Sequence, residues 1–115
     1  IAVDARLAKT QAELIRNTAI HEYGHAVHWN IVVAARRGDV SAKAALAEWD
    51  KICKKTKPDD WHAISPYAAS RQSMNPSDGM ARPESFAEAF TAFELGAHDR
   101  LTPDLIAFFR GLLIQ

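Results

Sequence analysis

The segment His21–His25 has the sequence HEYGH, an HExxH motif, and its residue types and spacing suit metal chemistry. On a helix, residues four apart lie on one face about 5–6 Å apart, so the imidazoles of His21 and His25 can bind one metal ion. Glu22 lies about 100° round that helix, where it can take a proton from a metal-activated water. Two imidazoles, a carboxylate and an open position for water suit Zn²⁺. The alternative is a helix whose histidines only pack.

The third ligand must come from outside the motif. His28 follows on the same helical stripe, but it lies two turns (~10.5 Å) from His21, too far for both to bind one ion comfortably. We expect His28 to form a polar wall of the site or to be an ordinary helix residue. The metzincin pattern requires Gly at position 28 and His at position 31, whereas this chain has His28 and Ile31, which excludes that class.

Two downstream carboxylates are the better candidates. Glu84 and Glu88 are four residues apart, so they share one face of a helix whose phenylalanines fall on the opposite side. Alanines at positions 87, 89 and 92 leave few obviously solvent-facing positions, which predicts a helix packed between two layers. Carboxylates on such a helix need a positive partner, and zinc with its histidines would be one. Spacing alone does not say which of the two is the ligand.

The elements that position these residues are predicted to be helices. Caps, prolines and apolar spacing predict helices over about Asp4–Arg37, Asp39–Lys57, Pro83–Leu95 and Thr102–Leu113. The stretch Pro58–Pro83 is rich in proline and small polar residues and predicts a loop, with a short extended piece over His62–Ser65. Gly24, inside the first helix, costs about 1 kcal/mol relative to alanine, which indicates close packing or a functional reason.

Length and composition predict a mainly α, single compact domain over residues 1–115, with little or no sheet. The 14 basic and 14 acidic residues cancel, so no overall charge favours nucleic acid or an anionic membrane. The single cysteine, Cys53, excludes an intrachain disulfide framework. No apolar run approaches the ~20 residues of a membrane span, and no segment resembles a signal peptide. Because the chain starts with Ile1 rather than Met, we expect a fragment or a processed piece of a longer protein.

Three segments together resemble a known family. HEYGHAVH, then SPYA, then PESFAEAF resemble the catalytic domain of anthrax toxin lethal factor and its relatives, over roughly Ile20 to Leu113. These are gluzincin-type zinc metallopeptidases, and similar domains occur in other bacterial toxins and in phage-associated proteins. The resemblance therefore implies a zincin-like fold, bound Zn²⁺, a peptide or protein substrate, and a bacterial or phage origin within a larger polypeptide.

The resemblance also assigns roles residue by residue. His21, His25 and Glu84 would bind zinc, and Glu22 would be the general base. Glu88 would accept a hydrogen bond from a zinc-binding histidine and so fix its tautomer. Tyr67 would help to stabilise the oxyanion formed during hydrolysis; its alternative role is to anchor a loop.

The chain departs from the family pattern in two places. Tyr67 lies seventeen residues before Glu84, farther than in the family, and the extra Ser70–Ala81 stretch is either a mobile lid or an insertion that displaces the tyrosine. Zincins also place a sheet before the HExxH helix, whose edge strand holds extended substrate. Only twenty residues precede His21, and they are predicted to be helical. Either the chain lacks this platform or the platform belongs to sequence not included here.

The sequence thus predicts a zinc-dependent metallopeptidase that hydrolyses an extended peptide. The alternative is a zinc-stabilised, non-catalytic binding or structural module of a larger phage or toxin protein, in which the metal contributes only folding free energy. Glu22 favours the first, because a structural site needs no base beside its ligands.

Overall fold

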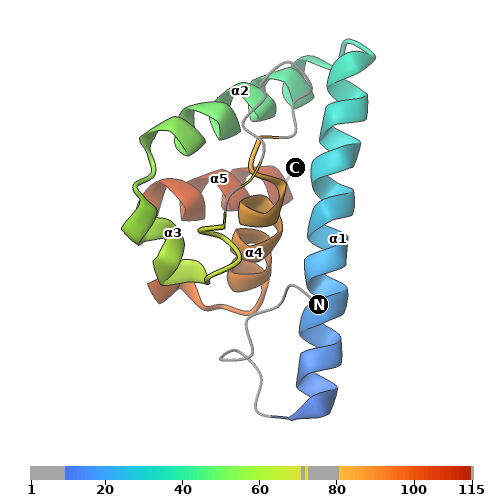
Figure 1. Cartoon of the computed structure of the whole chain (residues 1–115). Coiled ribbons are helices and arrows are strands. Elements are labelled where there is room, and N and C mark those ends of the chain that lie inside the picture. The colour runs from blue at the N-terminus through green and yellow to red at the C-terminus, as the bar shows by residue number, and fades with distance from the viewer. Residues whose placement is uncertain (1–9, 71, 73–80, 115) are drawn as a thin grey trace.

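The computed structural model of the chain describes residues 10–70, 72 and 81–114 (Figure 1). These residues form five α-helices and a short 3-10 helix, with no strand among them, which confirms the predicted mainly α fold. In chain order the elements are α1 (Gln11–Arg36), α2 (Val40–Lys55), α3 (Pro58–Ile64), α4 (Pro83–Glu94), η2 (His98–Arg100) and α5 (Pro103–Ile114).

Helix α1 begins later than predicted. Thr10 has an extended backbone, and its side chain accepts a hydrogen bond from the backbone N–H of Glu13 at 3.1 Å. This pairing of an N-cap threonine with a glutamate three residues on is a helix-start signal. The predicted helix is therefore not continuous through Thr10, and α1 begins at Gln11. Residues 4–9 lie outside the described residues.

Helix α3 occupies part of the stretch that was predicted to be a loop. Pro58 is in the first turn, where a missing N–H costs nothing, and two aspartates beside it favour the positive helix end. Trp61 and Ile64 lie three apart and are both buried. The extended piece predicted over His62–Ser65 is therefore wrong up to Ile64, and only Ser65 is extended, with φ −172° and ψ 163°. Of the predicted lid over Ser70–Ala81, residues 71 and 73–80 lie outside the described residues.

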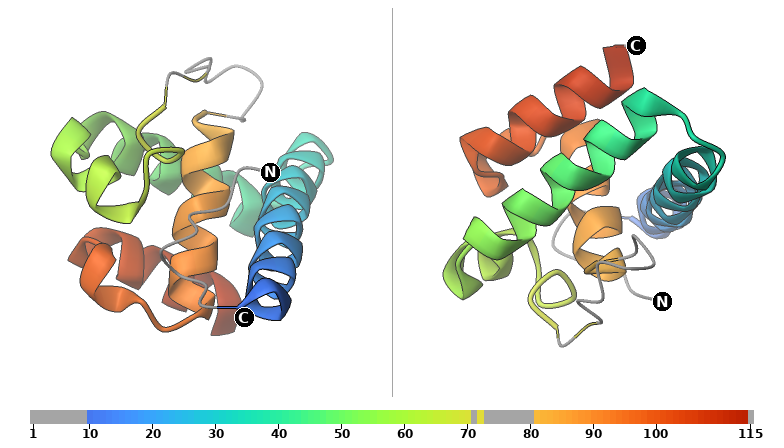
Figure 2. Two further views of the ribbon diagram at one scale, coloured as in Figure 1. Left: turned by 60° about the horizontal axis from the view of Figure 1, so that its bottom comes forward. Right: turned by 90° about the horizontal axis from the view of Figure 1, so that it is seen from above.

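Helix α4 lies at the centre of the molecule. Figures 1 and 2 show it between α1 on one side and α2, α3 and α5 on the other. All eight residues from Ser85 to Ala92 are buried, so the helix exposes no face over two turns. This confirms the prediction of a helix packed between two layers, and it means that every polar side chain in this segment needs a partner inside the protein.

The contact between α1 and α4 depends on Gly24. A Cβ atom at this position would lie 3.1 Å from the Cα atom of Ala87 and 3.1 Å from a ring carbon of Phe90. The close packing predicted for this glycine is confirmed. Because Gly24 lies between the two histidines of the motif, the close approach brings α4 against α1 at His21 and His25.

The other side of α4 faces a core of aromatic rings. Phe86 of α4 contacts Trp49 of α2 and Phe109 of α5, with ring centroids 5.0 and 5.3 Å apart. Phe90 contacts the same Phe109 ring at 6.1 Å.

Within the described part of the chain, no helix has the length and apolar character needed to cross a membrane.

Candidate metal centre

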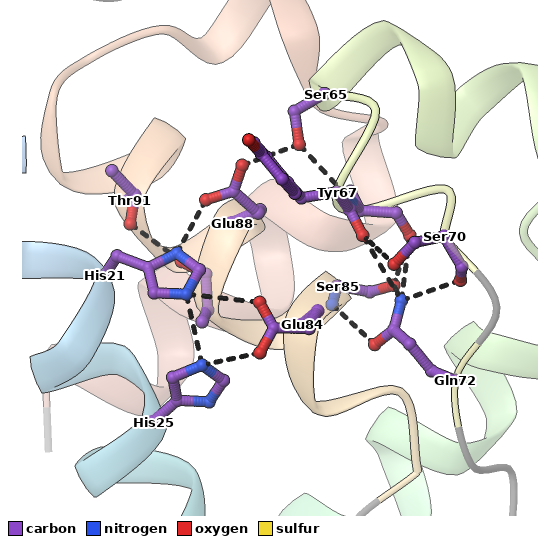
Figure 3. A network of polar contacts seen from close by, with 12 residues as sticks. His21, His25, Ser65, Tyr67, Ser70, Gln72, Glu84, Ser85, Glu88 and Thr91 are labelled. Carbon is purple, nitrogen blue, oxygen red and sulfur yellow. Dashed lines mark hydrogen bonds and ion pairs between the residues drawn. The ribbon is translucent and has the colours of Figure 1, made fainter. Parts of the chain in front are cut away.

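Three side chains from α1 and α4 converge on one point (Figure 3). The Nε2 atoms of His21 and His25 are 3.1 Å apart. The two carboxylate oxygens of Glu84 face them, with Oε1 3.0 Å from His25 Nε2 and Oε2 3.3 Å from His21 Nε2. His21 is fully buried, whereas His25 and Glu84 are partly open to solvent, at 27% and 33%. The cluster therefore lies at the edge of the protein interior.

Glu88 fixes the tautomer of His21. Its Oε2 atom is 2.7 Å from His21 Nδ1, and a carboxylate can only accept, so Nδ1 carries the hydrogen and Nε2 presents a lone pair. Figure 3 shows Glu88 at one ring nitrogen of His21 and Glu84 at the other. The two carboxylates that share a helix face thus contact different nitrogens of one imidazole, Glu84 at Nε2 and Glu88 at Nδ1.

The donor set leaves room for a cation. Glu84 Oε2 is buried and receives no hydrogen bond. When both histidines are neutral and His21 carries its hydrogen on Nδ1, a proton on His25 Nε2 can reach Glu84 Oε1 but leaves Glu84 Oε2 without a donor. A cation at the centre would contact all three groups at once. The residues present therefore fit a metal ion.

The acidic side chains also raise the pKa of His21. Burial by itself lowers that pKa, but the hydrogen bond that His21 donates to Glu88 and the negative charges of Glu88, Glu84 and Glu22 outweigh burial and raise the pKa above its ordinary value. Without a metal, His21 takes up a proton more readily than a free histidine does. The same negative potential attracts a metal cation.

Glu22 lies beside the cluster. One ligand atom from each of His21, Glu22 and His25 lies within 4.8 Å of the others, so these residues also form a group that could hold a metal ion. Glu22 is exposed to solvent, whereas an oxygen of Glu84 is buried against His21. Glu84 is accordingly the better third ligand by geometry, and Glu22 is the carboxylate that water can reach.

His28 lies in the core. It is completely buried, and its ring stacks on Phe86 with centroids 4.3 Å apart and an interplanar angle of 14°. The Trp49 ring lies at 6.2 Å. Of the two roles predicted for His28, these contacts match that of a packed helix residue.

Tyr67 lies on the turn that follows α3, and 38% of it is exposed. Its backbone carbonyl accepts hydrogen bonds from Ser70 and Gln72, whereas its hydroxyl has no hydrogen bond with any described residue. The structure brings together His21, His25, Glu84 and Glu88, but it does not place the Tyr67 hydroxyl in contact with them. Its part in oxyanion stabilisation stays a prediction.

Ser65 is the polar residue next to the site that the sequence did not assign. It is buried, its Oγ–H donates to Glu88 Oε1 at 2.7 Å, and its Oγ accepts from Ala68 N–H at 3.0 Å. The only sequence signal was its position at the start of the SPYA motif. No periodicity marks it, because it lies in an irregular segment.

No family model, curated protein or solved structure matches this chain. The argument for function therefore depends on the site itself.

Proposed function

We propose that the chain is a zinc-dependent metallopeptidase domain with His21, His25 and Glu84 as the zinc ligands. The observation that carries the proposal is the spacing of the donor atoms, 3.0, 3.1 and 3.3 Å. Zinc binds nitrogen and oxygen at ~2.0–2.1 Å, so two ligands at a tetrahedral angle are ~3.3 Å apart. Each of these donor pairs thus has nearly the spacing of two corners of such a tetrahedron, with the two histidines facing different oxygens of Glu84.

Glu22 supports a catalytic rather than a structural site. A bound zinc supplies a Lewis acid that makes water a better nucleophile and polarises an amide carbonyl. Glu22 is exposed beside the ligands, where its carboxylate can take a proton from the attacking water and pass it to the leaving amine. The partly open edge formed by His25 and Glu84 gives a peptide access to the same point.

Glu88, which is buried, supports the proposed role of His21 as a zinc ligand. Its hydrogen bond holds the proton of His21 on Nδ1, keeps Nε2 free for the metal, and increases the basicity of that nitrogen. The resemblance to the lethal factor family assigns the same roles to His21, His25, Glu84, Glu22 and Glu88. A peptide or protein substrate and a larger parent polypeptide remain part of the proposal on that basis.

The alternative is a zinc-stabilised, non-catalytic module. It is favoured by the position of Tyr67, whose hydroxyl does not contact the ligand cluster. It is also favoured by the lack of any strand in the described ranges that could hold an extended peptide. In this alternative the same ligands would bind zinc, but Glu22 would have no substrate to act on.

The test combines metal analysis with peptide cleavage. We expect one zinc per chain and cleavage of a peptide library that stops when a chelator removes the metal. Glu22→Gln should retain zinc and lose hydrolysis by about 10²–10⁴-fold, because an amide cannot accept the proton. Glu48→Gln, an exposed carboxylate on α2, is the matched control and should cleave at the normal rate.

The outcomes separate the two candidates. A protein that binds zinc but cleaves no peptide in the library supports the non-catalytic module. Equal hydrolysis by the wild type and Glu22→Gln would show that Glu22 is not the base. A purified, chelator-free protein without zinc, and with no thermal shift when zinc is added, would contradict both.

A further inference from the structure

Ser65 connects two parts of the molecule that lie far apart in sequence. It ends α3, is 1% exposed, and lies between that helix and the turn that carries Tyr67. Its hydroxyl donates a hydrogen bond to Glu88, which lies twenty-three residues later in the sequence. Glu88 is itself 3% exposed. Figure 3 shows the resulting order: Ser65, then Glu88, then the His21 ring, then Glu84.

We propose that Ser65 is a positioning residue that holds the Glu88 carboxylate, and through it the imidazole of His21, in the orientation that binds zinc. The inference rests on the proposed function in taking zinc as the ligand of this site.

The geometry of the hydroxyl explains why a serine can do this. The Oγ atom accepts the Ala68 N–H, which leaves its hydrogen free to point at Glu88 Oε1. Glu88 Oε2 in turn accepts from His21 Nδ1. The carboxylate is therefore held at both oxygens, by α1 on one side and by the turn on the other. A carboxylate held only at Oε2 could rotate about its last side-chain bond, and the imidazole would lose its fixed partner.

The same atom sets the position of the turn. Ser65 Oγ holds the N–H of Ala68, while the carbonyl of Ala68 accepts hydrogen bonds from Ser85 Oγ and from Arg82. Ser65 and Ser85 are both buried, and both hold the residue that follows Tyr67. Only Ser65 also contacts Glu88. Ser85 is thus a matched control that separates support of the turn from support of the carboxylate.

The main test is zinc affinity, measured by competition with a chromophoric chelator. Ser65→Ala should weaken zinc binding by about 10-fold, at the lower end of the range for loss of an outer partner. Ser85→Ala should leave zinc affinity unchanged, although it loses a buried hydrogen bond of the same turn. In a Glu88→Ala background, Ser65→Ala should cause no further loss, because the carboxylate through which it acts is absent.

Three results would overturn the inference: unchanged zinc affinity in folded Ser65→Ala, an equal loss in Ser85→Ala, or the same loss in the Glu88→Ala background. If Ser65→Ala does not fold, Ser65→Cys replaces it, because the thiol fills similar space and is a weak donor. This variant should lose affinity in the same direction, and wild-type affinity would count against the inference.

A second readout does not need the metal. In the zinc-free protein at alkaline pH, nitrogen-15 NMR should show His21 with its hydrogen on Nδ1 alone. Ser65→Ala should give a mixture of the two tautomers, while Ser85→Ala keeps one. A single Nδ1–H tautomer in Ser65→Ala would overturn the inference. Zinc binding without peptide cleavage would contradict the peptidase function and leave the Ser65 result standing. If no zinc binds, the zinc part of the inference fails together with the proposed function, and the tautomer experiment decides whether Ser65 positions Glu88 and His21.

Discussion

The two sides of α4 are both buried but are built in different ways. Toward α1 it presents Glu84 and Glu88, which meet two histidines through contacts of 2.7–3.3 Å. Toward α2 and α5 it presents Phe86 and Phe90, which contact Trp49 and Phe109 at centroid distances of 5.0–6.1 Å. Both rings also contact α1, where Phe86 stacks on His28 at 4.3 Å and Phe90 lies 5.8 Å from Tyr23. The first side is held by a few directional contacts between polar and charged groups. The second side is held by the packing of rings, which depends on their shape and on the area in contact.

This difference predicts how each side responds to change. On the polar side, removing one partner leaves a buried charge or lone pair without its counterpart, and the site loses its geometry. On the aromatic side, removing a ring leaves a cavity, and the free energy lost is the sum of many weak contacts. None of these contacts depends on the exact position of a single atom. Changes on the polar side should therefore alter zinc affinity, whereas changes on the aromatic side should alter stability.

The largest effect is expected from the two carboxylates. Glu84→Ala removes a proposed ligand and should abolish tight zinc binding, whereas Glu88→Ala removes the carboxylate at His21 Nδ1 and should weaken zinc binding by about 10–100-fold. Chelator competition measures both. Glu94→Ala, an exposed glutamate on the same helix, should change nothing. The reverse ranking of Glu84 and Glu88 would exchange their roles.

Phe109→Ala tests the aromatic side. This ring is completely buried and contacts Phe86, Phe90 and Phe93, so its loss should lower the free energy of unfolding by about 3–5 kcal/mol. Urea titration in the presence of chelator measures this cost without a contribution from zinc. The folded fraction should bind zinc with normal affinity. A large loss of affinity would mean that the two sides of α4 are not independent.

Gly24→Ala should have a smaller effect on stability. Gly24 is the position where α1 packs closely against α4. The added Cβ would lie 3.1 Å from the backbone of Ala87, so the overpacking should cost about 1–3 kcal/mol, more than the gain in helix propensity. Gly111→Ala in α5 is the matched control, because nothing lies within 4 Å of its added Cβ, and it should stabilise by up to about 1 kcal/mol. Thermal unfolding compares the two. Equal gains in both would show that α1 and α4 can move apart freely.

The smallest effect is expected at Cys53, which belongs to the aromatic core. Burial raises the pKa of its thiol to about 12, although the nearby Arg82 acts in the opposite direction. At neutral pH the folded protein should therefore react with a thiol reagent only as fast as the core opens. Adding urea should make the reaction rapid. Fast labelling of the native protein would show that the aromatic side is loosely packed.

Local rules in the sequence determined most of the helices and most of the candidate ligand set. Asp39 caps α2 through a 2.9 Å bond to Ala42 N–H, and Thr102 caps α5 at Leu105 N–H, both as predicted. The four-residue spacings placed each pair of site residues on one helix face, because helical geometry depends only on residues nearby in the chain. The same spacing could not choose between Glu84 and Glu88, since both point the same way.

Tertiary structure decided the rest. The loop predicted over Pro58–Pro83 did not include α3, because proline and small polar residues are typical of loops, whereas Pro58 is also compatible with a first helical turn and burial of Trp61 and Ile64 stabilises that helix. The close approach of α1 and α4 at Gly24 places Glu84 at Nε2 of His21 and Glu88 at Nδ1. The bond from Ser65 to Glu88 joins a turn to a helix across twenty-three residues. Irregular segments have no period from which such a contact could be predicted, so only the packing of the whole chain brings that hydroxyl to the carboxylate.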